Sequence, residues 1–215
     1  MTVKQYKHLN SLFEQYPDDT ERLAYSVCYL YNLEEQEVNL MKPERFVKYC
    51  DRLQKELQIK SVSDKRFETD ATKITAGQLL ECLKWMETGP VEQLHKIAAS
   101  ILKKRGKHIE DSEQMLNEDI KAVYQSVMEF LTSFNSLFEK FKWLFAAPID
   151  EDDKVKTTHP FIKNFGWVFS AKEVSNHLGI TLNETFKISS VEFLNALVYL
   201  KSKGQYDKWV SKQKT

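Results

Sequence analysis

The sequence is poor in glycine and proline and has few cysteines. Six glycines and five prolines occur among 215 residues, and this scarcity disfavours an all-β or loop-rich fold, because such folds need frequent turns. The three cysteines, Cys28, Cys50 and Cys82, are odd in number and contain no closely spaced pair. We therefore expect neither a disulfide framework nor a structural zinc site, and interpret all three as reduced core residues.

Net charge and long apolar runs are also absent. The chain carries 31 basic and 31 acidic side chains, so its formal net charge is zero and no overall field attracts nucleic acid or anionic lipid. No stretch approaches about 18 uninterrupted apolar residues, the length of a membrane span. The first ten residues lack the apolar segment of a secretion signal. We expect a protein of the cytoplasm with no membrane partner.

Motifs that carry catalysis or bind ligands are missing as well. Ile101 stands where a phosphate loop ending in Gly106-Lys107 needs a glycine. The acidic run Asp150–Asp153 lacks the glycine and the closing glutamate of a calcium loop. We expect no cofactor, no metal and no enzymatic activity. The rival interpretation is a small cytoplasmic enzyme whose cysteine and histidine side chains meet only in the folded chain.

A short basic segment, Lys103–His108, has two interpretations. It is able to contact phosphates, which would make the protein a nucleic-acid adaptor. The alternative is a set of cations at the end of a helix that stops at Gly106, where the helix dipole favours positive charge. We favour the second interpretation and do not expect nucleic acid as a partner.

The strongest pattern that is present runs from residue 111 to residue 145. Its apolar residues are separated by alternating steps of four and three, the period of one helix face. The face comprises Leu116, Ile120, Val123, Val127, Phe130, Phe134, Leu137, Phe141 and Leu144. A second apolar file widens this face, so we predict one long helix at the centre of a bundle, with self-association as the competing explanation.

Helix starts are marked by pairs in which a capping residue is followed three positions later by glutamate or glutamine. Six such pairs lie at the start of periodic segments: Thr2 with Gln5, Asn32 with Glu35, Thr75 with Gln78, Ser170 with Glu173, Thr181 with Glu184 and Ser189 with Glu192. They predict helices along most of the chain. The fold class is therefore all-α, a helical bundle around the central helix.

The apolar pattern divides the chain into four parts. We predict an N-terminal helical subdomain over 1–58, a central helical core over 59–147, a polar linker over 148–159 and a C-terminal helical subdomain over 160–215. Within the second part, residues 59–74 lose the helical period and form either one small β-hairpin or a plain linker. The last helix is predicted to end at Gly204.

Two sets of residues resemble known proteins. Leu23–Asn32, Leu33–Leu40 and Phe46 resemble the opening of tail-assembly chaperones of tailed bacteriophages, in which an apolar helix leads into an acidic short helix. A further set is similar to structural or assembly proteins of Bacteroidetes phages, including the crAss-like group: Lys65–Asp70, Lys73–Gln78, Leu94–Ala99, Phe165–Ser170 and Tyr199–Tyr206.

The resemblance implies a non-catalytic phage protein, either a tail or neck assembly chaperone or a virion component. Its partners would be other phage structural proteins or a second copy of the chain, in the host cytoplasm during assembly or in the virion. Aromatic residues of the predicted central helix are the candidate partner-binding residues: Phe130, Phe134, Phe138, Phe141 and Phe145.

Overall fold

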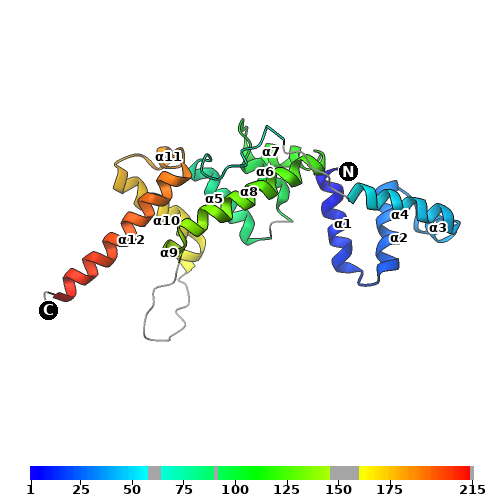
Figure 1. Cartoon of the computed structure of the whole chain (residues 1–215), viewed down its shortest axis with the longest axis horizontal. Coiled ribbons are helices and arrows are strands. Elements are labelled where there is room, and N and C mark those ends of the chain that lie inside the picture. Colours follow the sequence, from blue (N-terminus) through cyan, green and yellow to red (C-terminus); the bar gives the residue numbers. More distant parts are fainter. Residues whose placement is uncertain (58–63, 90–91, 146–159, 214–215) are drawn as a thin grey trace. The chain divides into compact units, whose positions relative to one another are not determined.

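A computed structural model describes residues 1–57, 64–89, 92–145 and 160–213 (Figure 1). Within these ranges the regular elements are helices, and β-type pairing is limited to isolated bridges. The predicted all-α fold class is therefore confirmed. Backbone contacts divide the chain into two compact units, one of Met1–Phe67 with Thr88–Val127 and one of Glu68–Glu87 with Met128–Thr215. These boundaries differ from those of the four predicted parts.

The first unit contains seven helical segments in its described residues. They are α1 (Val3–Gln15), α2 (Asp19–Tyr31), α3 (Glu35–Asn39), α4 (Pro43–Leu57), α6 (Leu94–Ser100), α7 (His108–Met115) and the first turns of α8 (Ile120–Lys140). Helix α2 contacts α1, α3 and α4, and α6 packs on α7. Leu9, Leu12 and Leu53 form a small buried cluster where α1 meets α4.

The second unit is built around α12 (Ser190–Gln213). This helix contacts α5 (Ala76–Glu87), α9 (Lys142–Phe145) and α10 (Pro160–Leu178), and α10 also packs on the one-turn helix α11 (Leu182–Thr185). The rest of α8 completes the unit. Its core includes fully or almost fully buried apolar side chains from these helices and from the residues just before α5, among them Ile74, Leu79, Phe130, Val174, Phe193 and Leu194.

The same pairing of two helix starts occurs once in each unit. In the first, Thr2 and Asp119 form an antiparallel bridge at the starts of α1 and α8; in the second, Thr75 and Ser189 do so at the starts of α5 and α12. Three backbone hydrogen bonds match between the units. Val3 N–H donates to Glu118 C=O, Lys4 N–H to Leu116 C=O and Ile120 N–H to Met1 C=O; the counterparts are Ala76 to Ile188, Gly77 to Phe186 and Ser190 to Ile74.

This shared pattern indicates that the chain contains two versions of one structural motif. In both versions the first helix starts with a reciprocal cap, Thr2 with Gln5 and Thr75 with Gln78. The caps and the bridge together satisfy backbone N–H groups that a helix start leaves without partners.

The single long helix predicted over 111–145 is not confirmed, because the structure divides that stretch into α7, α8 and α9. The apolar period continues through both breaks, so periodicity alone does not reveal them. Between α7 and α8, Leu116 and Glu118 accept hydrogen bonds from Lys4 and Val3 at the start of α1. In a continuous helix these two carbonyl oxygens would accept hydrogen bonds from N–H groups of the same helix. Here the start of α1 provides the donors instead, so the helix is interrupted without loss of hydrogen bonding.

The hairpin predicted over 59–74 is not confirmed either. Residues 58–63 lie outside the described residues, and 64–74 contain two short turns, at 65–66 and at 71–73. Phe67 instead pairs with Leu102 in an isolated bridge. Its β-type partner therefore lies in a segment distant in sequence and not within 59–74, as a hairpin would require. The linker predicted over 148–159 also lies outside the described residues.

Four of the six predicted helix starts are correct and two are wrong. Thr2, Thr75, Thr181 and Ser189 each accept a hydrogen bond from the backbone N–H three residues later. Asn32 instead ends α2, with φ at 52° and with Leu33 N–H bonded to Cys28 C=O, the arrangement of a helix C-terminus. Ser170 lies inside α10, because that helix is longer than the sequence pattern predicted.

Candidate functional site

The five candidate partner-binding phenylalanines do not form one surface. Phe130 and Phe134 are 0% and 4% exposed, so both belong to the core of the second unit. Phe138 is half-buried and stacks on Phe134, with 4.3 Å between ring centroids. Phe141 is half-buried, and the side chain of Phe145 lies outside the described residues. Phe130 and Phe134 thus serve the fold and are not available to a partner.

Helix α10 has apolar residues on two faces. Ala171 and Val174 are fully buried in the second unit. On the opposite face, Phe165, Val168 and Phe169 are spaced as neighbours on a helix surface and are 52%, 50% and 46% exposed. The sequence analysis assigned these residues only to the C-terminal helical subdomain over 160–215. The continuous apolar run from residue 165 to 169 is the signal that both faces are apolar.

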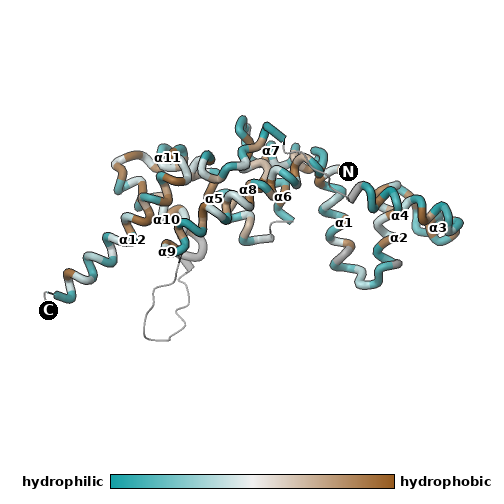
Figure 2. The backbone as a smooth tube through the Cα atoms, in the orientation of Figure 1, coloured by the Kyte–Doolittle hydropathy of each residue, from teal (hydrophilic) through white to brown (hydrophobic). Residues whose placement is uncertain are grey.

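Helix α12 continues beyond the core of its own unit. Phe193, Leu194 and Ala196 are buried, whereas every side chain from Ser202 to Trp209 is exposed. The hydropathy colouring shifts from brown to teal along this helix (Figure 2). The prediction that the helix ends at Gly204 is wrong. Tyr199, Tyr206 and Trp209 follow the helical period through that glycine.

Lys201 marks the point where α12 extends past the core of its unit. Its ammonium group donates to the carbonyl oxygens of Trp143 and Leu144, each at 2.8 Å, and lies 5.4 Å from the centre of the Trp143 ring. A cation at the end of α9 is favoured by the helix dipole and by the aromatic ring. The residues after this anchor are held by local bonds, including the ion pair of Lys203 with Asp207 at 2.8 Å.

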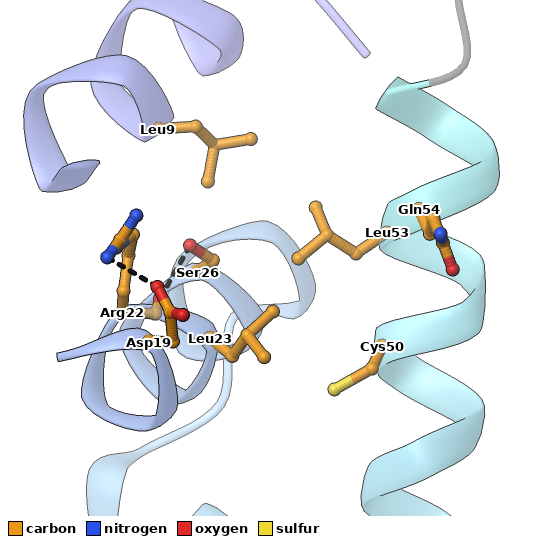
Figure 3. A pocket seen from close by; sticks show the side chains of 8 residues that line it. All are labelled: Leu9, Asp19, Arg22, Leu23, Ser26, Cys50, Leu53 and Gln54. Atoms are coloured by element: carbon orange, nitrogen blue, oxygen red, sulfur yellow. Dashed lines mark hydrogen bonds and ion pairs between the residues drawn. The ribbon is translucent and has the colours of Figure 1, made fainter.

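A cavity of about 410 Å³ lies between α1, α2 and α4 in the first unit (Figure 3). Leu9 comes from α1, and Cys50, Leu53 and Gln54 come from α4; α2 supplies Asp19, Arg22, Leu23 and Ser26. The leucine side chains point toward one another across this space. The cavity therefore has mostly apolar walls with an ion pair at one side.

That ion pair is fixed at the start of α2. Arg22 bonds to Asp19 at 2.6 Å and to the carbonyl oxygens of Tyr16 and Pro17. Its side chain is 19% exposed, while that of Asp19 is 89% exposed. The Arg22 guanidinium group is thus held by hydrogen bonds to the turn before α2. The Asp19 carboxylate faces solvent beside the apolar walls of the cavity.

A second cluster contains the half-buried His108 and the buried Ser100 but does not form a nucleophile and base pair. Ser100 is fully buried, and its Oγ donates to Lys96 C=O at 2.9 Å. His108 Nε2 lies 3.1 Å from that Oγ and 3.3 Å from the same carbonyl oxygen. Because a carbonyl oxygen only accepts, Nε2 carries the proton and does not act as a base toward Ser100. The cluster joins α6 to α7.

The thiols are poorly suited to act as nucleophiles. Burial raises the pKa of the Cys50 thiol, and the neighbouring Asp51 carboxylate raises it further. Burial and Glu35 similarly raise the pKa of Cys28, while Cys82 is fully buried. A thiol with a raised pKa stays protonated at neutral pH, and the thiolate is the reactive form.

The basic segment lies in an exposed loop. Helix α6 ends at Ser100 rather than at Gly106, because Leu102 forms the bridge with Phe67 and Lys103 N–H bonds to Arg66 C=O. The cations therefore lie beyond the helix end. Lys107 pairs with Glu110 at 3.2 Å, and Gly106 N–H donates to Asp111.

The described part of the chain contains no group of three or more histidine, cysteine or acidic side chains placed to hold a metal ion. None of the described helices combines the length and the apolar composition of a membrane span. Comparisons with protein-family models, with curated proteins and with solved structures each found no match.

Proposed function

We propose that this chain is a non-catalytic assembly protein that works by binding other proteins through its helix surfaces, in the manner of a tailed-phage tail or neck assembly factor or virion component. The supporting observation is the second apolar face of α10. Its members Phe165, Val168 and Phe169 are about half exposed. Exposed aromatic groups on a rigid helix are typical of protein-binding surfaces. The phage setting rests on the sequence resemblance alone.

The exposed apolar face of α10 is better explained by binding to another protein than by packing within this chain. Its buried face, with Ala171 and Val174, already packs within the unit. The opposite face leaves apolar area in contact with water, and a partner that covers this area gains roughly 25 cal/mol for each Å² it buries. A helix that presents anchors three and four residues apart fits an apolar groove or a helix on another protein.

The test is recovery of the tagged chain with purified virions or with an isolated tail or neck protein. We expect the native chain to be recovered at a fixed ratio. The double substitution Phe165→Ser/Phe169→Ser should reduce recovery more than about tenfold, because exposed aromatic anchors carry much of the energy of such contacts.

The matched control is Leu40→Ser, which removes a side chain that is 86% exposed in the other unit. It should leave recovery unchanged. The fold of the double variant is checked by circular dichroism. Recovery of the native chain in neither virions nor complexes contradicts the proposal, as does unchanged recovery of a folded double variant.

A further inference from the structure

The cavity between α1, α2 and α4 is too large to be an ordinary packing defect. Its volume is about 410 Å³, whereas protein cores contain few voids larger than a water molecule. A cavity of about 150 Å³ already holds a benzene ring, and pockets for small ligands span roughly 300–1,000 Å³. The space between these three helices therefore has the size of a ligand site.

The walls of this cavity carry apolar side chains on all three sides. Leu9 of α1 and Leu53 of α4 are almost fully buried, and Leu23 of α2 points toward them (Figure 3). The Sγ atom of Cys50 points from α4 toward α2. Burial raises the pKa of this thiol, and the Asp51 carboxylate raises it further, so the thiol is uncharged at neutral pH. These walls offer contacts to an apolar ligand.

The polar groups on the α2 wall are already bonded within the chain. Ser26 is 2% exposed, and its Oγ donates to Arg22 C=O at 2.7 Å. The Arg22 side chain donates to Tyr16 C=O, to Pro17 C=O and to the Asp19 carboxylate. Because Asp19 and Arg22 neutralise each other, a charged ligand would lose its hydration without gaining an unpaired counter-ion. The walls therefore favour an uncharged occupant.

We propose that this cavity binds a small uncharged molecule with an aromatic or aliphatic body, held between Leu9, Leu23 and Leu53. Burial of apolar area drives the binding, because water in this space finds few polar partners and is readily displaced. The cavity belongs to the first unit and the exposed face of α10 to the second. This ligand site is therefore separate from the protein-binding surface of the proposed function.

The experiment measures binding of N-phenyl-naphthylamine to the purified full chain, from the rise in fluorescence of this uncharged probe in an apolar site. The native chain should show saturable binding at a single site. Anilinonaphthalene sulfonate has the same ring skeleton with one negative charge. It should bind more than about tenfold more weakly, because its charge is costly to bury.

Two variants change the cavity itself. Cys50→Phe places a ring in the space and should weaken binding of N-phenyl-naphthylamine more than about tenfold. Leu23→Ser removes part of the wall at a side chain that is 40% exposed, and should weaken binding several-fold. The matched control is Lys48→Phe, which adds the same ring at an exposed position on the opposite side of α4 and should bind the probe like the native chain. The fold of each variant is checked by circular dichroism.

Alkylation of the thiols by N-ethylmaleimide shows where the probe binds. Mass spectrometry of the peptides gives the rate of modification at each cysteine. Saturating N-phenyl-naphthylamine should slow the alkylation of Cys50 several-fold, because this thiol lines the cavity, and should leave that of Cys28 unchanged. If Cys50→Phe does not fold, this protection and the variant Leu23→Ser decide the question.

The inference is overturned if the native chain does not bind N-phenyl-naphthylamine, if a folded Cys50→Phe variant binds it normally, or if the charged analogue binds equally well. It is also overturned if Phe165→Ser/Phe169→Ser abolishes binding, because the probe would then occupy the exposed face of α10.

The outcomes for the cavity and for the proposed function are distinguishable. Native chain that binds the probe as expected but is recovered in neither virions nor complexes would support this inference and remove the proposed function. If the probe does not bind and Cys50→Phe instead lowers recovery with a phage protein, the cavity receives a side chain of that partner. The proposed function would then stand without this inference.

Discussion

Replacing Phe193 by alanine should lower the free energy of unfolding of the second unit by about 3–5 kcal/mol. Its ring is fully buried in that unit, on the first turn of α12. Removing it leaves a cavity that the surrounding helices fill only in part, so both transfer energy and packing contacts are lost. Because small domains have total stabilities of about 5–15 kcal/mol, this single change approaches the limit that the unit tolerates.

The matched control is Tyr199→Ala on the same helix, at a side chain that is 51% exposed. It removes an aromatic ring of similar size that stacks on His177, with 4.6 Å between ring centroids, and should cost no more than about 1 kcal/mol. Both variants are compared with the native chain by urea denaturation monitored by circular dichroism. Equal losses for the two variants would contradict the placement of Phe193 in the core.

Stability should fall when the pH is lowered from about 6.5 to about 4, because His95 resists protonation in the folded chain. The side chain is 7% exposed, and Lys7 Nζ lies 3.4 Å from its Nδ1. Burial first, and then the charges of Lys7, Lys96 and His108, lower the pKa of His95 to about 4 from its ordinary value of 6.5. The neutral imidazole is thus the form that the fold accommodates.

The sign follows from the protons bound in each state. Between pH 6.5 and 4 the unfolded chain binds a proton at His95 and the folded chain does not, so acid favours unfolding. The full difference corresponds to at most about 3 kcal/mol, and it is reached near pH 4. Arg66 lowers the pKa of both Asp64 and Glu118, so protonation of these carboxylates destabilises the fold only as the pH falls below their ordinary pKa values of 3.8 and 4.5, and Glu118 therefore contributes only at the acid end of this range.

The measurement is urea denaturation at several pH values for the native chain and for His95→Gln. The native chain should lose stability across this range, and the variant should lose less. If the native chain is equally stable at pH 7 and pH 4.5, or if the variant keeps the same pH dependence, the assigned role of His95 is wrong.

Capping pairs in the sequence predicted most helix starts correctly, because the two residues of a pair lie within one helical turn of each other. A hydroxyl group three residues before glutamine or glutamate marks a helix start because both partners lie within one turn, and Thr2, Thr75 and Thr181 behave as predicted. Asn32 carries the same signal, but its backbone adopts the left-handed conformation and closes the preceding helix. Asparagine suits both roles, so the pattern does not distinguish them.

The candidate site was harder to predict, since exposure depends on what the rest of the chain covers. Phe130 and Phe165 are the same residue type on helical stretches, yet one is fully buried and the other is 52% exposed. The apolar run around Phe165 shows that α10 has two apolar faces, but it does not show which of them the rest of the chain covers. The cavity draws on α1, α2 and α4 at once, and no spacing within one segment identifies such a set.

The sequence by itself determined the all-α class, most helix starts and the apolar faces, because capping, period and composition act within a few residues. Only the tertiary structure decided where helices are interrupted and which apolar faces remain in contact with water. The break between α7 and α8 exists because the chain's first residues bond to its backbone, and the same arrangement recurs at α5 and α12. Such contacts join residues far apart in sequence, so their hydrogen bonds leave no local pattern.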